Sequence, residues 1–241
     1  MKPTKAFILK IRDPISEKYA EVAANSCDAI GLKWQYFNGY QNMSGIDAWG
    51  LTGVKMKWIP PVRPEIIAEP SDAQKAHCCS ASHGEIWRLI AEGKDEAVIV
   101  LEHDAIMLHP VDIDIPENEI VALGYKITDP EKYDHVRAGP PEKLVAINGH
   151  HGAHAYAITK KTAQFLVNEI EAFGILGAVD NAYFMQGQRR TAAKLSITSP
   201  IAALGWLRES TIWSQGSAIA NYEFLESFSN YYKYNGRRTK H

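Results

Sequence analysis

Apolar runs and helical spacings alternate from the start of the chain. A short apolar run at 5–11 is followed by Asp13-Pro14, which is typical of a helix N-cap with proline at the first helical position. Apolar side chains then recur at helical spacing between residues 19 and 30, and Gly31 ends the predicted helix. An alternating segment at 34–37 predicts a second strand. This strand–helix–strand order forms a βαβ unit, so we expect a parallel sheet with a right-handed crossover.

The middle of the chain, residues 40–101, is predicted to contain a long loop, then a helix, then a buried strand. Residues 40–70 are rich in Gly, Pro and Trp and lack a clean period, which predicts a long irregular loop of the functional kind. Ser71-Asp72-Ala73-Gln74 has the pattern of a capping box, so we expect a helix to begin there and to end at Gly93. The five apolar residues at 97–101 are typical of a strand buried on both faces.

The second half predicts five more elements and a distinct C-terminal segment. We expect strands at 119–124, 144–147, 155–158 and 195–198 and a helix at 160–173. Residues 231–241 hold two Lys, two Arg and three Tyr but no acid, so we expect one domain over 1–230 and a basic aromatic tail over 231–241. The fold class indicated by this order of elements is α/β.

Composition narrows the class of protein. With 46% hydrophobic and 22% charged residues and a net charge of −2, the 241-residue chain is neither largely disordered nor a polyanion binder through bulk charge. We expect no transmembrane segment, and the apolar start is too short for the core of a signal peptide. Three cysteines, with Cys78 and Cys79 adjacent, indicate a reducing, cytoplasmic setting, and we interpret these two as buried small side chains rather than a metal pair.

Glu102-His103-Asp104, directly after the buried strand, is the sharpest candidate for chemistry. In open α/β sheets ligands bind beyond the carboxyl ends of strands. Two acids separated by one residue can both approach a hard divalent cation, and His103 would favour Mn²⁺ over Mg²⁺. The alternative is a solvated strand end. Arg12, after the first strand, is a candidate for binding a base or phosphate, with a solvated surface arginine as its alternative.

Three histidines gather further along, at His150, His151 and His154. On a strand, His150 and His154 would share one face, and one of the three could bind a metal or a diphosphate. A hydrolytic zinc centre is the less favoured reading, because no carboxylate or thiolate partner lies nearby in the sequence.

Several segments in order are similar to glycosyltransferase family 25, the lipopolysaccharide and procollagen galactosyltransferase group. Cys79, Ser82 and His83 match that family's Gly-Cys-x-x-Ser-His segment, with Cys78 in place of the glycine. Glu102 and Asp104 match the outer members of its Glu-Asp-Asp motif, with His103 in place of the middle acid.

Three later segments extend this resemblance over most of residues 5–213. Residues 152–159 resemble the family's Gly-x-x-x-Tyr strand, Val179-Asp180 its Val-Asp motif, and Ser210-Thr211-Ile212 its C-terminal Ser-x-Ile. The resemblance implies a GT-A-like domain with a Rossmann-like, mainly parallel sheet flanked by helices. It also implies inverting transfer of a sugar from a nucleotide-sugar donor, a UDP-hexose, to a hydroxyl acceptor.

The resemblance implies roles for particular residues as well. Asp104 and Glu102 would hold Mn²⁺ or Mg²⁺, and Ser82, His83 and Glu102 would contact the donor. His103 as a further metal ligand and Arg12 as a donor contact are expected from their own positions after strands. Asp180 would act as the base that accepts the proton of the acceptor hydroxyl, the alternative being a helix N-cap before residues 181–186.

The acceptor and two other functions stay open at this point. The acceptor is a glycan or another hydroxyl compound, and the basic aromatic tail permits a nucleic acid such as a hydroxylated base. One alternative is a metal-dependent hydrolase built on Glu102-His103-Asp104 and the three histidines. The other is an inactive protein that binds sugar nucleotides.

Overall fold

A large mixed sheet with helices on both faces forms the frame of the protein. The computed structural model describes residues 1–56, 70–124, 139–150, 152–175, 178–185, 187 and 189–205, with the side chains of 70–73 excepted. The predicted tail at 231–241, the domain boundary at 230 and Ser210-Thr211-Ile212 lie outside these residues.

The seven strands of this sheet are not in sequence order. Across the sheet they run β2 (Lys33–Asn38), β1 (Lys5–Lys10), β3 (Ala97–Glu102), β7 (Ala155–Thr159), β5 (Glu119–Ala122), β8 (Lys194–Ser199) and β6 (Lys143–Ala146). β1 pairs in parallel with β2 and β3, and β5 with β8, whereas β7 and β6 are antiparallel to their neighbours. Since only β7 and β6 run against the others, the expected α/β fold with a mainly parallel sheet is confirmed.

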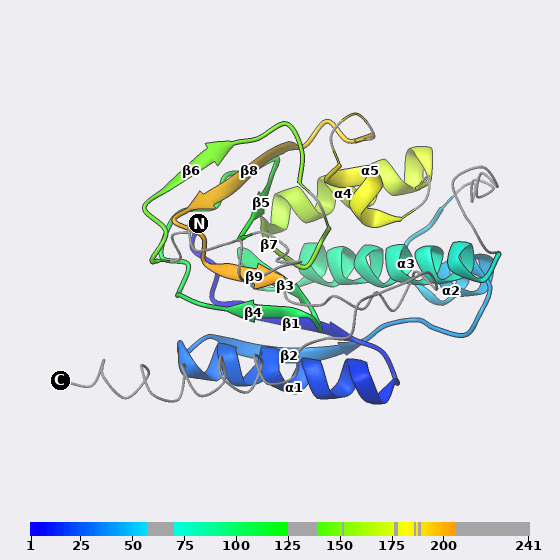
Figure 1. Cartoon of the computed structure of the whole chain (residues 1–241). Coiled ribbons are helices and arrows are strands. Elements are labelled where there is room, and N and C mark those ends of the chain that lie inside the picture. The colour runs from blue at the N-terminus through cyan, green and yellow to red at the C-terminus, as the bar shows by residue number, and fades with distance from the viewer. Residues whose placement is uncertain are drawn as a thin grey trace.

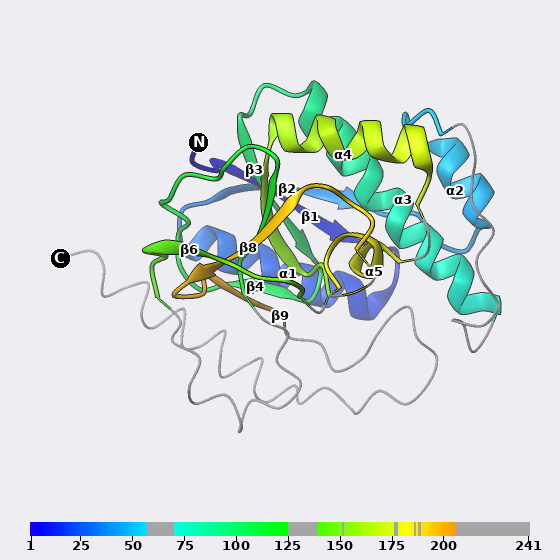
Figure 2. The same ribbon diagram turned by 90° about the horizontal axis from the view of Figure 1, so that it is seen from above.

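The helices cover both faces of this sheet. α1 (Pro14–Ala29) lies on one face, and α3 (Pro70–Glu92) and α4 (Lys160–Phe173) lie side by side on the other (Figures 1 and 2). α1 begins as predicted, with the Asp13 side chain accepting from the Ile15 and Ser16 amides and Pro14 in the first turn. Gly31 follows the helix with a φ of 72°, a conformation that favours glycine. The predicted βαβ opening is confirmed.

The alternation of side chains along β3 decides what its last residue faces. Val98 and Val100 pack in the apolar cluster that includes α3 and α4, while Ile99 and Leu101 pack in the cluster that includes α1. β3 is therefore buried on both faces, as its apolar run predicts. Continuing the alternation by one residue directs Glu102 toward α3.

The reversed direction of β7 brings a second segment to the same edge. β7 is antiparallel to β3, with Ala155 opposite Leu101, so β7 begins where β3 ends. The Glu102 amide donates to the backbone oxygen of His154 at 2.8 Å. The residues just before β7 therefore lie at the carboxyl end of β3, where α/β proteins place their ligands.

The structure corrects three local predictions. The loop expected at 40–70 contains the short helix α2 (Gly45–Leu51), whose first turn is capped by the Ser44 hydroxyl and which buries Trp49. α3 begins at Pro70, so Ser71 lies inside the helix and the capping box there is wrong. Two unpredicted strands, β4 (Ala105–Met107) and β9 (Ala203–Gly205), form a second small sheet; three residues are too few to show a period.

Among the described residues, no helix combines the length and the apolar character that a membrane crossing requires.

Candidate active site at the end of β3

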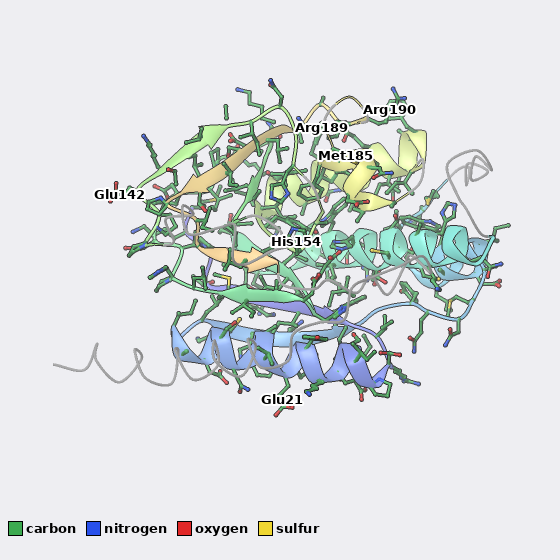
Figure 3. All side chains as sticks on the ribbon, viewed as in Figure 1. Glu21, Glu142, His154, Met185, Arg189 and Arg190 are labelled. Carbon is green, nitrogen blue, oxygen red and sulfur yellow. The ribbon has the colours of Figure 1, made fainter. Side chains whose placement is uncertain are left out.

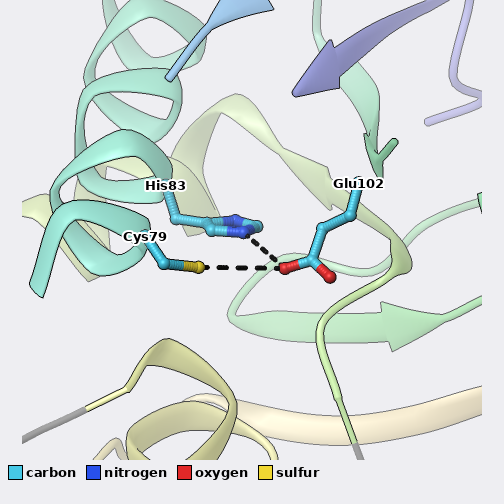
Figure 4. Close-up of side chains that lie close together, drawn as sticks. All are labelled: Cys79, His83 and Glu102. Atoms are coloured by element: carbon cyan, nitrogen blue, oxygen red, sulfur yellow. Dashed lines mark hydrogen bonds and ion pairs between the residues drawn. The ribbon is translucent and has the colours of Figure 1, made fainter. Parts of the chain in front are cut away.

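Glu102 is the centre of a cluster between β3 and α3. Its Oε1 lies 3.1 Å from Nε2 of His83 and 4.0 Å from Sγ of Cys79 (Figure 4). Cys79 and His83 are four residues apart on α3, so they share one face of that helix. The helix thereby presents a thiol and an imidazole to the carboxylate that β3 aims at it.

A chain of buried hydrogen bonds holds His83 in place. Trp87 Nε1 donates to the Tyr156 hydroxyl at 2.7 Å, and that hydroxyl lies 2.8 Å from Nδ1 of His83. An indole nitrogen can only donate, so the hydroxyl accepts from Trp87, which leaves its own hydrogen to be donated to Nδ1 when His83 is neutral. A neutral His83 then carries its hydrogen on Nε2, facing Glu102. All three side chains are buried, and together they orient the Glu102 carboxylate.

The surroundings keep Glu102 ionised. Burial by itself raises the pKa of Glu102, but the hydrogen bond from His83, together with the charge of that imidazole when it is protonated, outweighs it. The charges of His154 and His103 act in the same direction, and the pKa of Glu102 is lowered to about 2. A negative carboxylate at the end of a strand is therefore available as a ligand at neutral pH.

A second group of donors also contains Glu102. Ligand atoms of Glu102, Asp104 and His154 all lie within 4.8 Å of one another. The chain turns at His103-Asp104 between β3 and β4, which brings Asp104 back toward the edge, and the start of β7 brings His154. Asp104 and His154 are buried, and His154 lies in the interior of the molecule (Figure 3).

Two glycines make room for the His154 ring. A Cβ on Gly152 would lie 2.1 Å from Cε1 of His154, and a Cβ on Gly205 would lie 2.4 Å from its Cδ2. Gly152 also has a φ of 83°, which favours glycine. The position of this imidazole is thus set by the backbone of two segments that are far apart in the sequence.

His103 lies apart from both donor groups. Within the described part of the chain, the sets of three donors are Cys79/His83/Glu102 and Glu102/Asp104/His154, and His103 is in neither. Its ring centroid is 6.5 Å from that of Tyr19 on α1, on the opposite side of the sheet from α3. Metal binding by His103 stays a prediction.

The other clustered histidines have different positions. His150 and His154 do lie together, with ring centroids 5.7 Å apart, but in a loop rather than on the strand that the prediction assumed. The ring nitrogens of His150 lie 3.0 Å from the Gly152 oxygen and 2.6 Å from the Gly124 oxygen, which fastens this loop to the end of β5. His151 lies outside the described residues.

Asp180 belongs to a short helix that packs against α3. α5 (Val179–Tyr183) has Ala178 at its N-cap, so Asp180 lies in its first turn, and the alternative interpretation of Asp180 as a helix N-cap is wrong. Burial raises the pKa of Asp180, and so does the charge of Glu102.

The Cys79 thiol is affected by the same carboxylates. Burial and then the charges of Glu102, Asp180 and Asp104 raise the pKa of this thiol well above its ordinary value. The negative charges of Glu102, Asp104 and Asp180 are therefore all close enough to Cys79 to disfavour its thiolate form.

The remaining donor-site candidates lie along the same edge. Arg12 is exposed just beyond the end of β1, which runs parallel to β3. The Ser82 hydroxyl donates to the Cys78 oxygen at 2.7 Å and accepts from the Tyr40 amide at 2.9 Å, which fastens the segment after β2 to α3. Donor binding by Arg12 and Ser82 stays a prediction.

Comparisons with known proteins add structural likenesses only. No family model matches the sequence, and no curated protein sequence matches it. The apo form of the glycosyltransferase GlyE of Streptococcus pneumoniae TIGR4 is similar with a TM-score of 0.46 and 10% identity, over 95% of this chain and 60% of that one. The galactosyltransferase LgtC, solved with donor and acceptor sugar analogs, is similar with a TM-score of 0.39 and 13% identity, over 94% and 95% of the two chains.

A third similar structure is also named as a glycosyltransferase. It is a glycosyltransferase involved in the glycosylation of the major capsid of PBCV-1, with a TM-score of 0.33 and 10% identity over 69% of this chain and 65% of that one. The chain spans 60% of the length of GlyE. All three names describe glycosyl transfer by those proteins, and membership of this chain in family 25 stays a prediction.

Proposed function

We propose that this chain transfers a sugar from a nucleotide-sugar donor, a UDP-hexose, to the hydroxyl of a glycan or another acceptor. The observation that supports this most is the set of Glu102, Asp104 and His154, which gathers at the carboxyl end of β3. This is the edge where a strand of opposite direction enters the sheet and where α/β proteins bind ligands.

The donor set fits a divalent cation. Two carboxylates and one imidazole suit Mn²⁺ better than Mg²⁺, because Mg²⁺ prefers oxygen ligands alone. Asp104 and His154 are buried beneath the edge, while the Glu102 side chain is 21% exposed and leaves a side open toward a ligand. When bound, the cation would neutralise the charge that develops on a diphosphate leaving group. Here His154 takes the role that the sequence suggested for His103.

Other residues of this edge take the remaining roles. Asp180 is half-buried on α5 and accepts the proton of the acceptor hydroxyl in an inverting displacement. Arg12, exposed beyond β1, binds the base or a phosphate of the donor. His83 is fully buried and has both ring nitrogens engaged, so its role is to orient Glu102 rather than to touch the donor.

Nucleotide sugars with and without Mn²⁺ test this proposal. Because a ligand that binds only the folded state stabilises it, a matching UDP-sugar should raise the melting temperature, and Mn²⁺ should enlarge that rise. The same donor should then be consumed with release of UDP when acceptors are supplied. UDP-glucose, UDP-galactose and the corresponding ADP and GDP sugars form the first panel.

Two results would replace the proposal by its alternatives. Cleavage of simple phosphoesters with Mn²⁺ or Zn²⁺ and no response to any nucleotide sugar would indicate the metal-dependent hydrolase. The observation that favours the hydrolase is the position of His154, which adds an imidazole to the carboxylates of Glu102 and Asp104. Binding of a nucleotide sugar without turnover on any acceptor would indicate the inactive binding protein.

A further inference from the structure

The thiol of Cys79 has no part in the proposed sugar transfer, yet it is aimed at Glu102. We propose that Cys79, His83 and Glu102 form a second metal site, which takes one zinc ion through Sγ, Nε2 and a carboxylate oxygen. This site shares Glu102 with the Glu102/Asp104/His154 group but lies on the α3 side of it. The inference does not rest on the proposed function.

The distances require little rearrangement. Oε1 of Glu102 lies 3.1 Å from Nε2 of His83 and 4.0 Å from Sγ of Cys79, and the three ligand atoms are all within 4.8 Å of one another. Tetrahedral zinc, with bonds of about 2.3 Å to sulfur and about 2.0 Å to nitrogen and oxygen, places its ligand atoms about 3.3–3.6 Å apart. The separations between ligand atoms therefore have to change by at most about 1.3 Å to enclose the ion.

The chemistry of the donors favours zinc over harder cations. A thiolate and an imidazole are ligands of Zn²⁺ rather than of Mg²⁺ or Ca²⁺, and three protein ligands leave a fourth position for water. Binding releases the thiol proton to solvent. The hydrogen of His83 moves from Nε2 to Nδ1. The Tyr156 hydroxyl turns its own hydrogen away from Nδ1, and its second lone pair accepts the Nδ1 hydrogen.

The surroundings of His83 match those of a metal-bound histidine. Such a histidine nearly always has its other ring nitrogen held by a hydrogen bond, and here Tyr156, itself bonded to Trp87, holds Nδ1. His83 is buried, whereas Glu102 is 21% exposed, so the ion enters past the carboxylate. Cys79 is half-buried beside it.

The two other cysteines provide matched controls within the same chain. Cys78, one residue away, is buried and its thiol donates to the Met43 oxygen at 3.5 Å, and Cys27 is a buried residue of α1 itself. Neither is a member of a donor group among the described residues. Replacing either by serine should leave metal binding unchanged.

Cobalt, which replaces zinc and absorbs light, is the probe for the test. Titrating the full chain with Co²⁺ should produce a near-ultraviolet thiolate-to-cobalt charge-transfer band that saturates at one ion per chain and disappears on addition of one Zn²⁺. Cys79→Ser should abolish the band and weaken Zn²⁺ binding by more than about 100-fold, since loss of an outer partner alone costs 10- to 100-fold. Cys78→Ser should keep both.

The variant Asp104→Asn separates this site from the one used in the proposed function. It removes a ligand of the Glu102/Asp104/His154 group only, so the cobalt band should persist. The inference is overturned if wild-type protein gives no band, if Cys79→Ser retains it, or if Asp104→Asn loses it. Zinc X-ray absorption on the wild-type chain needs no variant: one sulfur at about 2.3 Å supports the site, and a shell of nitrogen and oxygen alone overturns it.

Discussion

Replacing Tyr156 by phenylalanine removes one oxygen atom from the centre of the buried chain that orients Glu102. That oxygen accepts from Trp87 Nε1 at 2.7 Å and lies 2.8 Å from His83 Nδ1. The phenyl ring keeps the packing of Tyr156 in the core, so the change isolates the two hydrogen bonds. Both nitrogen atoms would be left buried without their partner, since the side chains of Trp87 and His83 are fully buried.

The size of the effect follows from those two atoms. A buried polar group that loses its only partner costs about 1–3 kcal/mol. Two such groups, less the gain from burying a more apolar ring, give an expected loss of about 2–4 kcal/mol in the free energy of unfolding. For a chain of this length, 1 kcal/mol corresponds to about 2–4 °C, so the melting temperature should fall by about 4–16 °C.

Urea unfolding without metal is the assay. Tyr156→Phe should lower the midpoint and leave the slope of the free energy with urea unchanged. Tyr36→Phe is the control, because its hydroxyl is near the surface, 3.4 Å from the Ala20 oxygen in a residue that is 37% exposed. That change should stay within about 0.5 kcal/mol. Equal effects of the two variants, or a loss below about 0.5 kcal/mol for Tyr156→Phe, would refute the hydrogen-bond chain.

Three further variants test separate parts of the site. Asp180→Asn should leave donor binding intact and reduce transfer by about 10²–10⁴-fold, as loss of a general base does; loss of donor binding as well would give Asp180 another role. Gly205→Ala should displace the His154 ring, because the new Cβ would lie 2.4 Å from Cδ2, and should weaken Mn²⁺ binding at least 10-fold, whereas Gly50→Ala, with open space around it, should not. Ser82→Ala should lower the free energy of unfolding by about 1–2 kcal/mol, since its hydroxyl makes two hydrogen bonds; an added loss of donor affinity would show that it also contacts the donor.

Local periodicity explains which parts of the fold could be predicted. The helices at 14–29 and 160–173 and the strand at 97–102 have long, regular patterns and were predicted within one or two residues. The direction of β7 could not be predicted, because an apolar strand has the same pattern in either direction and its pairing with β3 joins residues over fifty positions apart. That reversal is what brings His154 to Glu102.

The sequence predicted only those residues of the site that are close to one another in the chain. Glu102 and Asp104 followed from their place after a buried strand, a feature of the sequence itself. The contact of Cys79 with Glu102 depends on how α3 crosses the sheet, and the four-residue spacing from Cys79 to His83 was the available signal. His103, adjacent to both acids in sequence, turns toward α1 instead, since successive residues at a strand end point to opposite faces.

Binding of Mn²⁺ in the presence of UDP tests the central proposal most directly. Electron paramagnetic resonance of free Mn²⁺ should show one ion bound per wild-type chain, more tightly when UDP is present. Asp104→Asn should lose this binding while its melting temperature without ligand holds or rises, because a buried functional carboxylate is dispensable for packing. Asp112→Asn, an exposed carboxylate paired with Lys2, should bind as the wild type does. Full Mn²⁺ affinity in Asp104→Asn would contradict the assignment of the site.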